Sequence, residues 1–552
     1  MSRVSPSARW EALRGILAVG HLRRMYVVVG LWAATELAFF LAVSVVAYGD
    51  GGPGAVGLVG AARVLPGALS LGFVAVVADR VSRPLLVAAA NVALVGICLL
   101  MAAVVAAGGS LVLLVLLQVA ASVATALVHP SLHGLLPRLV PLPSQLIQAG
   151  AVWTLVTGIG AVLGPGIGGW LLARGGPDVL FLALAVVYAV TAGLAASIRT
   201  TYQPAREPSG SPRRSAWWWS PLRGIGLFAA PGARTMLALS LVQRALGGLV
   251  GAFLVLYAFE VFGADGQARS GTLLAAVGVG GLVGSTITLG VVGRHTRWWF
   301  AAGLLLSGVP LVVLGATTEV GPAMLALGVC GAGAAWALIY GSSLVTRLLP
   351  DHVAGRGWGA LLGLGAGAAA LGSLAAPLLA RLLGLPDAML VTGVLAAVAV
   401  LVAVPGLRTL AGRTVPRPED VALLNSVGVL APLPGICIER LAVAAGRWAV
   451  EPGEVVVHQG EPGQEFFVVA DGVLVVSVEG REVRRLRGGD AFGEVALLRH
   501  VPRTATVVAT RPSVLLTLDR DAFVTTVTGH RPTDAWAEAV VADVLAGDAR
   551  RG

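Results

Sequence analysis

The sequence GIGAVLGPGIGG, residues 158–169, lies inside a long apolar run and combines several glycines with one proline. Small residues in a membrane-spanning helix allow neighbouring helices to approach closely. Pro165 removes a backbone hydrogen bond and bends the helix that contains it. The stretch therefore predicts a closely packed, bent helix within a membrane-spanning bundle.

The composition of the whole chain agrees with that prediction. Of the 552 residues, 56% are hydrophobic and only 12% are charged, whereas soluble domains have about 25% charged residues. The net charge of +10 could suggest binding to nucleic acid. However, the arginines stand at the ends of apolar runs, which is the pattern that membrane topology produces. We therefore expect the lipid bilayer, and not nucleic acid, to be a partner of this chain.

Several classes of activity find no support in the sequence. All 39 basic residues are arginine, and a P-loop needs a lysine, so ATP-driven pumping by this chain is not expected. Cys98, Cys330 and Cys437 are scattered and give neither a disulfide framework nor metal-ligand spacing. Since no nucleophile–base arrangement is found either, we expect a protein that is not an enzyme and has no cofactor or metal. The N-terminal arginines lead directly into a full-length span, so no cleavable signal peptide is expected.

Twelve apolar runs have the length of about 20 residues that a membrane-spanning helix needs. They fall at about 26–48, 55–77, 85–107, 110–132, 146–173, 179–196, 236–259, 270–293, 298–316, 320–346, 357–383 and 388–405.

The arginines in the loops predict the orientation of these spans. If the N-terminus lies inside, only three loop arginines lie outside, namely Arg174, Arg269 and Arg381. The inside set holds Arg3, Arg9, Arg14, Arg23, Arg24, Arg80, Arg83, Arg138, Arg199, Arg206, Arg213, Arg214, Arg223, Arg234, Arg294, Arg297, Arg347 and Arg356. This positive-inside bias predicts a multi-pass protein of the plasma (inner) membrane with both termini in the cytoplasm.

A weak internal repeat divides the chain into two halves. The longest internal loop, about 197–235, follows the sixth apolar run. The sequence ADRVSRP (78–84) follows the second run, and VGRHTRW (292–298) follows the eighth. Two six-helix halves, here about 20–198 and 234–405, are the pattern of the major facilitator superfamily. The chain resembles that family over residues 1–405, which implies an all-α polytopic transporter domain.

Two motifs make this resemblance specific. Asp79, Arg80 and Arg83 in DRVSR resemble the superfamily's cytoplasmic loop signature, in which an acid and arginines latch helix ends, although Ala75 stands where a glycine is usual. The opening stretch resembles the signature of drug antiporters at Gly160, Gly164, Pro165, Gly168 and Gly169. Together with HPSLHGLLPRLVP (129–141), it is most similar to the enterobactin-exporter branch, which implies antiport and efflux.

Three charged residues inside predicted spans are candidates for transport, because charges within the bilayer are costly. Glu36 lies roughly 15 Å into the first span, and Arg63 lies about 12 Å into the second from the opposite side. The two could meet. Glu36 is then either a proton-coupling or cation-recognising acid with Arg63 as its modulator, or half of a structural ion pair. Arg244 is a candidate for binding an anionic substrate or lipid. His129 and His133 either line a cavity or lie at the membrane interface, and Gln118, Trp336 and Tyr340 either line the path or only pack. The segment SAWWWSPLRGIGLF (215–228) suits an anchor in the membrane interface.

After about residue 406 the pattern changes from apolar runs to short β-rich runs separated by glycines. These runs are EVVVHQG, EFFVVADG, VLVVSVEG, EVRRLRGG and TATVVAT, with helical stretches expected at about 419–446 and 519–546. Such spacing predicts a β-roll with flanking helices. We assign residues 406–423 to a linker and 424–546 to this second domain.

The second domain contains the polar stretch FGEVALLRHVPRTATV, residues 492–507. Free backbone N–H groups at a helix start can hold a phosphate, and Arg503 can add a charge-assisted hydrogen bond. Glu494 cannot favour a phosphate, but it can accept a hydrogen bond from a sugar hydroxyl. The stretch thus suits a cyclic nucleotide, and it resembles the phosphate-binding cassette of cyclic-nucleotide-binding domains such as those of the catabolite activator protein and protein kinase A regulatory subunits.

That resemblance implies a role for each residue of the cassette. Gly493 permits close backbone approach, and Glu494 binds the ribose 2′-hydroxyl. A short helix from Val495 to Leu498 directs its amides, notably that of Ala496, at the phosphate. Arg503 pairs with the phosphate, Thr504 bonds the phosphate or the base, and Ala505 is small where the ligand is close. We expect cAMP in preference to cGMP, and no residue in 534–546 identifies the cap over the base. The alternative is an inert β-roll that has kept the loop sequence.

Two functions remain open. The first is a secondary active transporter, a proton-coupled exporter of an unknown small molecule, regulated by a cyclic nucleotide. The second is a membrane-tethered cyclic-nucleotide receptor without transport activity. A proton-coupling acid favours the first, and a blocked cavity would favour the second. A transcription factor is not expected, because too little chain follows residue 530 for a helix-turn-helix motif.

Overall fold

The computed structural model describes residues 20–140, 146–198, 226–228, 231–288, 295–349, 351–409, 417–430, 433, 435–499, 501–520 and 522–523. The chain forms two compact units, Met1–Thr409 and Leu410–Gly552. Three predicted features lie outside the described residues: most of the tryptophan-rich segment 215–228, most of the helical stretch expected at 519–546, and the side chains of Asp79 and Arg80.

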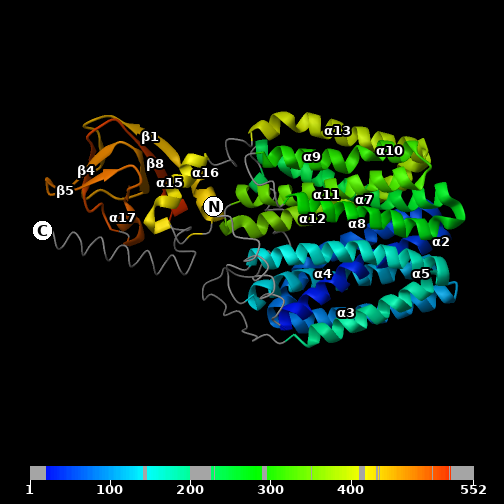
Figure 1. The fold of residues 1–552 in the computed structure, drawn as a ribbon. Coiled ribbons are helices and arrows are strands. Elements are labelled where there is room, and N and C mark those ends of the chain that lie inside the picture. The colour runs from blue at the N-terminus through cyan, green and yellow to red at the C-terminus, as the bar shows by residue number, and fades with distance from the viewer. Residues whose placement is uncertain are drawn as a thin grey trace, which may run out of the picture. The chain divides into compact units, whose positions relative to one another are not determined.

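The described part of the first unit is almost entirely helical (Figure 1). Ten of its helical ranges are long and apolar enough to cross a membrane. The helices are α2 (Gly20–Arg80), α3 (Arg83–Ala106), α4 (Leu111–Leu139), α5 (Leu146–Ala196), α7 (Pro231–Phe262), α8 (Gly266–Thr288), α9 (Thr296–Gly308), α10 (Pro310–Ala316), α11 (Val320–Leu348), α12 (Asp351–Leu383) and α13 (Leu385–Thr409).

Two of these helices each contain two of the predicted spans. The backbone leaves the helical conformation at Gly52 in α2, where φ is 63°, and at Gly176 in α5, where φ is 81°. Both glycines belong to a Gly-Gly-Pro sequence, at 51–53 and 175–177. Glycine adopts positive φ without strain, and the proline that follows cannot donate the helical hydrogen bond. The described parts of the twelve predicted spans are thus helical, with the ninth divided into α9 and α10 at Val309. The break in α5 at Gly176 falls between the predicted spans 146–173 and 179–196.

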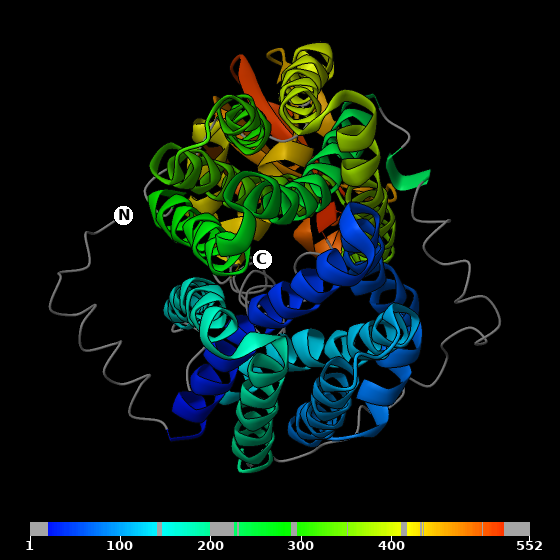
Figure 2. The ribbon, with the colours of Figure 1, turned by 90° about the vertical axis from the view of Figure 1, so that its right-hand side faces the viewer.

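The helices of the first unit pack as two groups. Figure 2, which looks nearly along the helices, shows those of residues 20–196 (blue to cyan) on one side and those of residues 231–409 (green to yellow) on the other. Glycines allow the helices to touch at their backbones. A Cβ on Gly248 of α7 would overlap the carbonyl oxygen of Ala369 in α12, and one on Gly280 of α8 would overlap that of Gly328 in α11. Close approach of this kind provides the van der Waals contact that joins helices in lipid.

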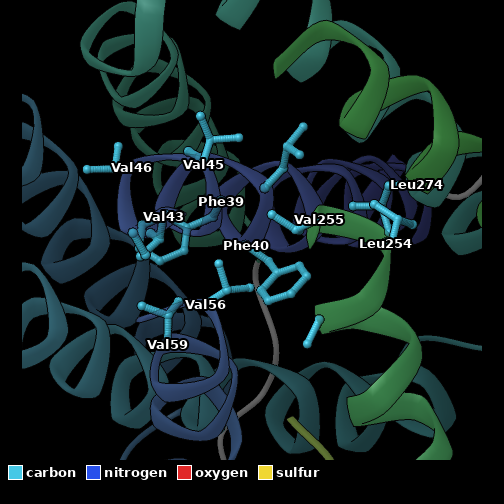
Figure 3. Packing of buried hydrophobic residues seen from close by; sticks show 14 of the residues in the cluster. Phe39, Phe40, Val43, Val45, Val46, Val56, Val59, Leu254, Val255 and Leu274 are labelled. Atoms are coloured by element: carbon cyan, nitrogen blue, oxygen red, sulfur yellow. The ribbon is translucent and has the colours of Figure 1, made fainter. Parts of the chain in front are cut away.

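A large buried cluster connects the two groups of helices. It includes Phe40 and Val56 from the two arms of α2, and Leu254 and Val255 from α7. Figure 3 shows Phe40 beside Val56 and Val255, with Leu254 beside Leu274. Gly251 of α7 faces the ring of Phe40, because a Cβ at that position would lie 3.6 Å from the ring. The packing of α2 therefore depends on both halves of the unit.

The second unit is the predicted β-roll with helices against it. Two four-stranded antiparallel sheets have the strand orders β1-β8-β3-β6 and β2-β7-β4-β5. The strands are β1 (Gly446–Val450), β2 (Val455–Val457), β3 (Glu465–Asp471), β4 (Val473–Val478), β5 (Arg481–Arg487), β6 (Ala491–Phe492), β7 (Thr506–Ala509) and β8 (Ser513–Asp519). The helices are α15 (Pro418–Ser426), α16 (Gly435–Ala444) and α17 (Glu494–Arg499). The helical stretch expected at 419–446 is therefore two separate helices.

Strand β3 separates two cores by the alternation of its side chains. Phe466 and Val468 pack with Ile438 of α16, and Phe467 and Val469 pack with Leu474 between the sheets. All four β3 side chains are buried. The strand thus fixes both the helices and the second sheet around the loop that follows β6.

Candidate functional sites

The predicted phosphate-binding residues come together at one pocket of the second unit. Gly493, Glu494, Val495 and Ala496 reach it from the start of α17, and Arg503, Thr504 and Ala505 reach it from the segment before β7. The remaining walls come from β2, β4, β5, β6 and β7 and are mostly apolar: Val457, Val476, Val478, Val483, Arg484, Leu486, Ala491, Phe492 and Val507.

Arg503 is held in place by backbone carbonyl groups. The residue is only 7% exposed. Nη2 donates a hydrogen bond to the carbonyl oxygen of Glu465 over 2.7 Å, and Nη1 donates to that of Gly493 over 3.3 Å. The guanidinium also lies 5.5 Å from the centre of the Phe467 ring. Since a guanidinium has five N–H donors, these contacts leave others for an anion in the pocket.

Two glycines make room for this arginine. Gly493 has a φ of 96°, and a Cβ there would lie 2.5 Å from Nη1 of Arg503. A Cβ on Gly463 would lie 2.8 Å from the Cβ of Ala496. Side chains larger than hydrogen at either position would therefore displace the arginine or α17.

The electrostatic surroundings of Arg503 are mixed. Burial lowers the pKa of its guanidinium, and the carboxylates of Glu465, Glu494 and Glu461 oppose that shift. An arginine stays protonated at any physiological pH. The pocket therefore contains a buried positive charge with a carboxylate, Glu494, at the start of α17.

Sequence reasoning missed Arg484, which lines the same pocket from β5. Its Nη2 lies 3.2 Å from Oδ1 of Asp490, and its side chain is 51% exposed. It also missed the stacking of Phe492 on Phe467, whose ring centres are 4.9 Å apart. The run EVRRLRGG contains three arginines, at 484, 485 and 487, and nothing in the sequence shows which of them faces the pocket.

The first unit contains a cavity of about 590 Å³ lined by helices from both halves. Its polar and charged lining includes Glu36 and Arg63 of α2, Gln118 and Ser122 of α4, and Arg244 of α7. Its aromatic lining comes from the first half: Trp32, Phe39, Phe40 and Tyr188. The structure thus brings all three predicted transport residues to one cavity. Of the other candidates for the path, Gln118 and His129 line it, and Trp336 and Tyr340 are not among its described lining residues.

Glu36 and Arg63 form an ion pair at the wall of this cavity. Nη2 of Arg63 lies 2.9 Å from Oε1 of Glu36, and their side chains are 28% and 35% exposed. The guanidinium also lies 4.7 Å from the centre of the Phe40 ring. Ser122 of α4 holds the arm of α2 that carries Arg63, because its hydroxyl donates to the carbonyl oxygen of Arg63 and accepts from the amide of Gly67.

Two histidines extend the polar wall along α4. Nε2 of His129 lies 3.2 Å from Nε2 of His133. The ring of His129 is tilted against Trp32, and that of His133 against Trp153. His129 lines the cavity together with Glu36. The sequence offered these histidines only as candidates for a cavity wall, because spacing alone does not show which face of α4 is open.

The predicted gating motif lies where α2 ends and α3 begins. Asp79 and Arg80 are the last residues of α2, and Arg83 is the first of α3. The guanidinium of Arg83 occupies the space beside Gly134 of α4, where a Cβ would overlap it. Elsewhere in the first unit, Nη1 of Arg24 in α2 donates a hydrogen bond to the carbonyl oxygen of Ser197, the residue after α5.

The antiporter-type motif is a surface of close helix contact. Cβ atoms on Gly160 and Gly164 of α5 would overlap the backbone of α2 at Gly30 and Ala34. Further along, a Cβ on Gly168 would lie 3.3 Å from Ala38 of α2, and one on Gly169 would lie 2.8 Å from Gly271 of α8. Pro165 lies in the same helix. The motif therefore places α5 directly against both α2 and α8.

Comparison with known families agrees with both parts of this description. The model of the Major Facilitator Superfamily matches residues 25–360, and that of the cyclic nucleotide-binding domain matches residues 447–529. The first match covers more than half of the chain.

Individual relatives match a smaller part of the chain. A cAMP-dependent protein kinase regulatory subunit of Yarrowia lipolytica is 40% identical over 102 residues, which are 18% of this chain and 27% of the relative. The cGMP-dependent protein kinase egl-4 of Caenorhabditis briggsae is 40% identical over 87 residues, which are 16% of this chain and 11% of the relative. The chain thus spans less than a third of these curated relatives. The solved regulatory domain of Toxoplasma gondii PKA with cAMP is 27% identical, with a TM-score of 0.20, over 24% of this chain and 49% of that one.

Proposed function

Since the chain belongs to the Major Facilitator Superfamily and carries a cyclic nucleotide-binding domain, we propose that it is a proton-coupled exporter of small molecules that a cyclic nucleotide regulates. Export, proton coupling and regulation are the parts of this proposal that go beyond family membership. The proposal also places the protein in the plasma (inner) membrane with both termini in the cytoplasm, where cyclic nucleotides are made.

The ion pair of Glu36 and Arg63 carries the proposal of proton coupling. A carboxylate that titrates must reach water, and Glu36 lines the 590 Å³ cavity with 35% of its side chain exposed. Protonation of Glu36 removes the charge that Arg63 pairs with, so the two protonation states differ in the contacts that hold the two arms of α2 together. A proton can therefore favour one arrangement of the helices over another.

Regulation rests on the pocket around Arg503. A cyclic nucleotide offers one phosphate and one ribose hydroxyl at short distance, and the pocket offers a buried guanidinium and the carboxylate of Glu494. We propose cAMP as the ligand in preference to cGMP. The ligand can shift the transporter between states only by its different affinity for them. Couplings of that kind are typically ~1–3 kcal/mol.

The alternative is a receptor that has lost transport. Such a protein would not need a titratable ion pair inside an open cavity, and the cavity between the two halves is lined by charged and polar side chains. This observation favours the transporter.

Flux through the full-length protein tests the proposal. A strain that lacks the gene is first screened for hypersensitivity to toxic compounds, which identifies a substrate. The protein is then reconstituted in proteoliposomes, and flux of that compound is measured with and without a proton gradient, and with and without saturating cAMP. We expect flux to depend on both. Flux that does not depend on the gradient would contradict proton coupling. Flux that does not change with cAMP or cGMP would favour a receptor role for the second unit.

A further inference from the structure

The described residues that line the 590 Å³ cavity of the first unit, here called the transport cavity, carry an excess of positive charge. They include two guanidinium groups, Arg63 and Arg244, and one carboxylate, Glu36. Arg63 and Glu36 neutralise one another in their 2.9 Å ion pair. His129, the histidine on this wall, can only add positive charge when it is protonated. Arg244 therefore presents a charge that no carboxylate of the described wall balances.

Arg244 lies deep in the helix bundle. It follows the first residue of α7 by about 20 Å of helix at 1.5 Å per residue. The aliphatic part of its side chain runs along α12, because a Cβ on Gly365 would lie 3.2 Å from Cγ of Arg244. Within the parts of the chain that the structure describes, its guanidinium has no hydrogen-bond acceptor and no carboxylate partner.

A guanidinium without a partner in this position is expected to bind an anion. Charged groups within a membrane domain are costly, and they pair with one another or face a water-filled cavity. The same wall also holds two buried polar atoms that have no hydrogen-bond partner in the described structure, Oε1 of Gln118 and Nε1 of Trp32. Buried polar atoms are nearly always satisfied by protein, water or a ligand. The wall thus combines an unpaired positive charge with one buried donor and one buried acceptor that have no partner among the described residues.

The rest of the wall suits an apolar body. Trp32, Phe39, Phe40 and Tyr188 present aromatic rings to the cavity. Its volume of about 590 Å³ lies within the range of ~300–1,000 Å³ that small-molecule sites occupy. A ligand that fits must therefore combine an anionic group with an aromatic or other apolar part.

We propose that the transported substrate is an organic anion, a carboxylate, sulfonate or phosphate on an aromatic or apolar body, whose anionic group binds Arg244. The guanidinium is suited to this role because its planar N–H groups bind such anions through two parallel hydrogen bonds. This proposal rests on the proposed transport function, and it names the class of molecule that enters the cavity.

Equilibrium binding to the purified full-length protein tests the proposal without any gradient. The probes are anilinonaphthalene sulfonate, an aromatic anion, and tetraphenylphosphonium, an aromatic cation. Arg244→Gln removes the charge, Arg244→Lys keeps the charge without the planar N–H fork, and Gly365→Leu keeps the arginine but pushes it aside. Arg174→Gln is the matched control, because Arg174 stacks on Trp170 and is not among the described lining residues.

We expect the wild type and Arg174→Gln to bind the anion with equal affinity, and Arg244→Gln and Gly365→Leu to bind it at least tenfold more weakly. Arg244→Lys should retain an intermediate affinity, and it gives the answer if Arg244→Gln does not fold. The cation should bind more weakly than the anion to the wild type. Equal anion binding by the wild type and Arg244→Gln, or preference for the cation, would overturn the proposal. A loss of proton coupling in the flux assay leaves this binding result unaffected, so the two proposals can fail separately.

Discussion

Arg63 donates a hydrogen bond to Glu36 over 2.9 Å, although 27 residues and a helix break at Gly52 separate them in the sequence. The two residues lie on antiparallel arms of α2, and each reaches the same wall of the cavity. The pair is therefore both a link between two spans and a charged group on the wall of the cavity. The substitutions below separate these roles.

Glu36→Gln is expected to abolish proton-driven flux and to leave the protein folded, because glutamine keeps the shape and the hydrogen-bond acceptor but cannot titrate. Flux of an identified substrate into proteoliposomes with an imposed gradient measures the effect. Glu260→Gln is the matched control, since Glu260 is exposed near the end of α7. Full gradient-driven flux in Glu36→Gln would make the ion pair purely structural.

Arg503→Ala is expected to weaken binding of cAMP by at least ~1.5 kcal/mol, the lower range for a hydrogen bond to a charged group. Isothermal calorimetry with the full-length protein measures the affinity. Arg485→Ala is the control, because Arg485 pairs with Glu482 and is 63% exposed outside the pocket lining. If neither the wild type nor Arg485→Ala released heat with cAMP or cGMP, the pocket would not be a nucleotide site.

The response of transport to cAMP is expected to disappear in Arg503→Ala. In the wild type, saturating cAMP should change the flux about 5- to 150-fold, the range of typical coupling energies. The ratio of flux with cAMP to flux without it is the measurement, so that each variant serves as its own reference. A ratio that stays the same in Arg503→Ala would mean that the nucleotide acts at another place.

Gly164→Ala is expected to destabilise the transporter, because the added methyl group would overlap the backbone of Ala34 in α2. Overpacking of this kind costs typically 1–3 kcal/mol. Gly166→Ala is the control in the same helix, since a Cβ there would lie 4.0 Å from the nearest side chain, Ala275. Thermal unfolding of the two purified variants compares them. Equal stability would show that α5 can move away from α2 at no cost.

Much of the fold could be predicted because it depends on local patterns. Apolar runs separated by short polar segments locate the twelve spans, and the depth of Glu36 and Arg63 along their helices suggested that they could meet. Strand β8 was missed because SVLLTLD is a nearly continuous apolar run without clear alternation, and β6 has only two residues.

The candidate sites could be predicted only in part, since their walls come from distant segments. The cassette from Gly493 to Ala505 is local, so its residues could be named from the sequence. Arg484 faces the pocket because of the pairing of β4 with β5, where Val476 lies opposite it. The contact of His129 with Trp32 likewise depends on how α4 packs against α2. Patterns in a single sequence show neither how two strands pair nor how two helices pack against each other.

Phe40 connects the ion pair of Glu36 and Arg63 with a helix of the other half of the unit. On one side, the ring of Phe40 contacts the guanidinium of Arg63, which lies 4.7 Å from the ring centre. On another side, the ring faces Gly251 of α7, which has no side chain between the ring and the helix backbone. On the proposal of proton coupling, neutralising Glu36 removes the charged partner of Arg63, and we expect the ring of Phe40 to lose part of its contact with that guanidinium. Through Phe40, the charge of Glu36 is then expected to affect how α2 packs against α7 in the opposite half of the unit.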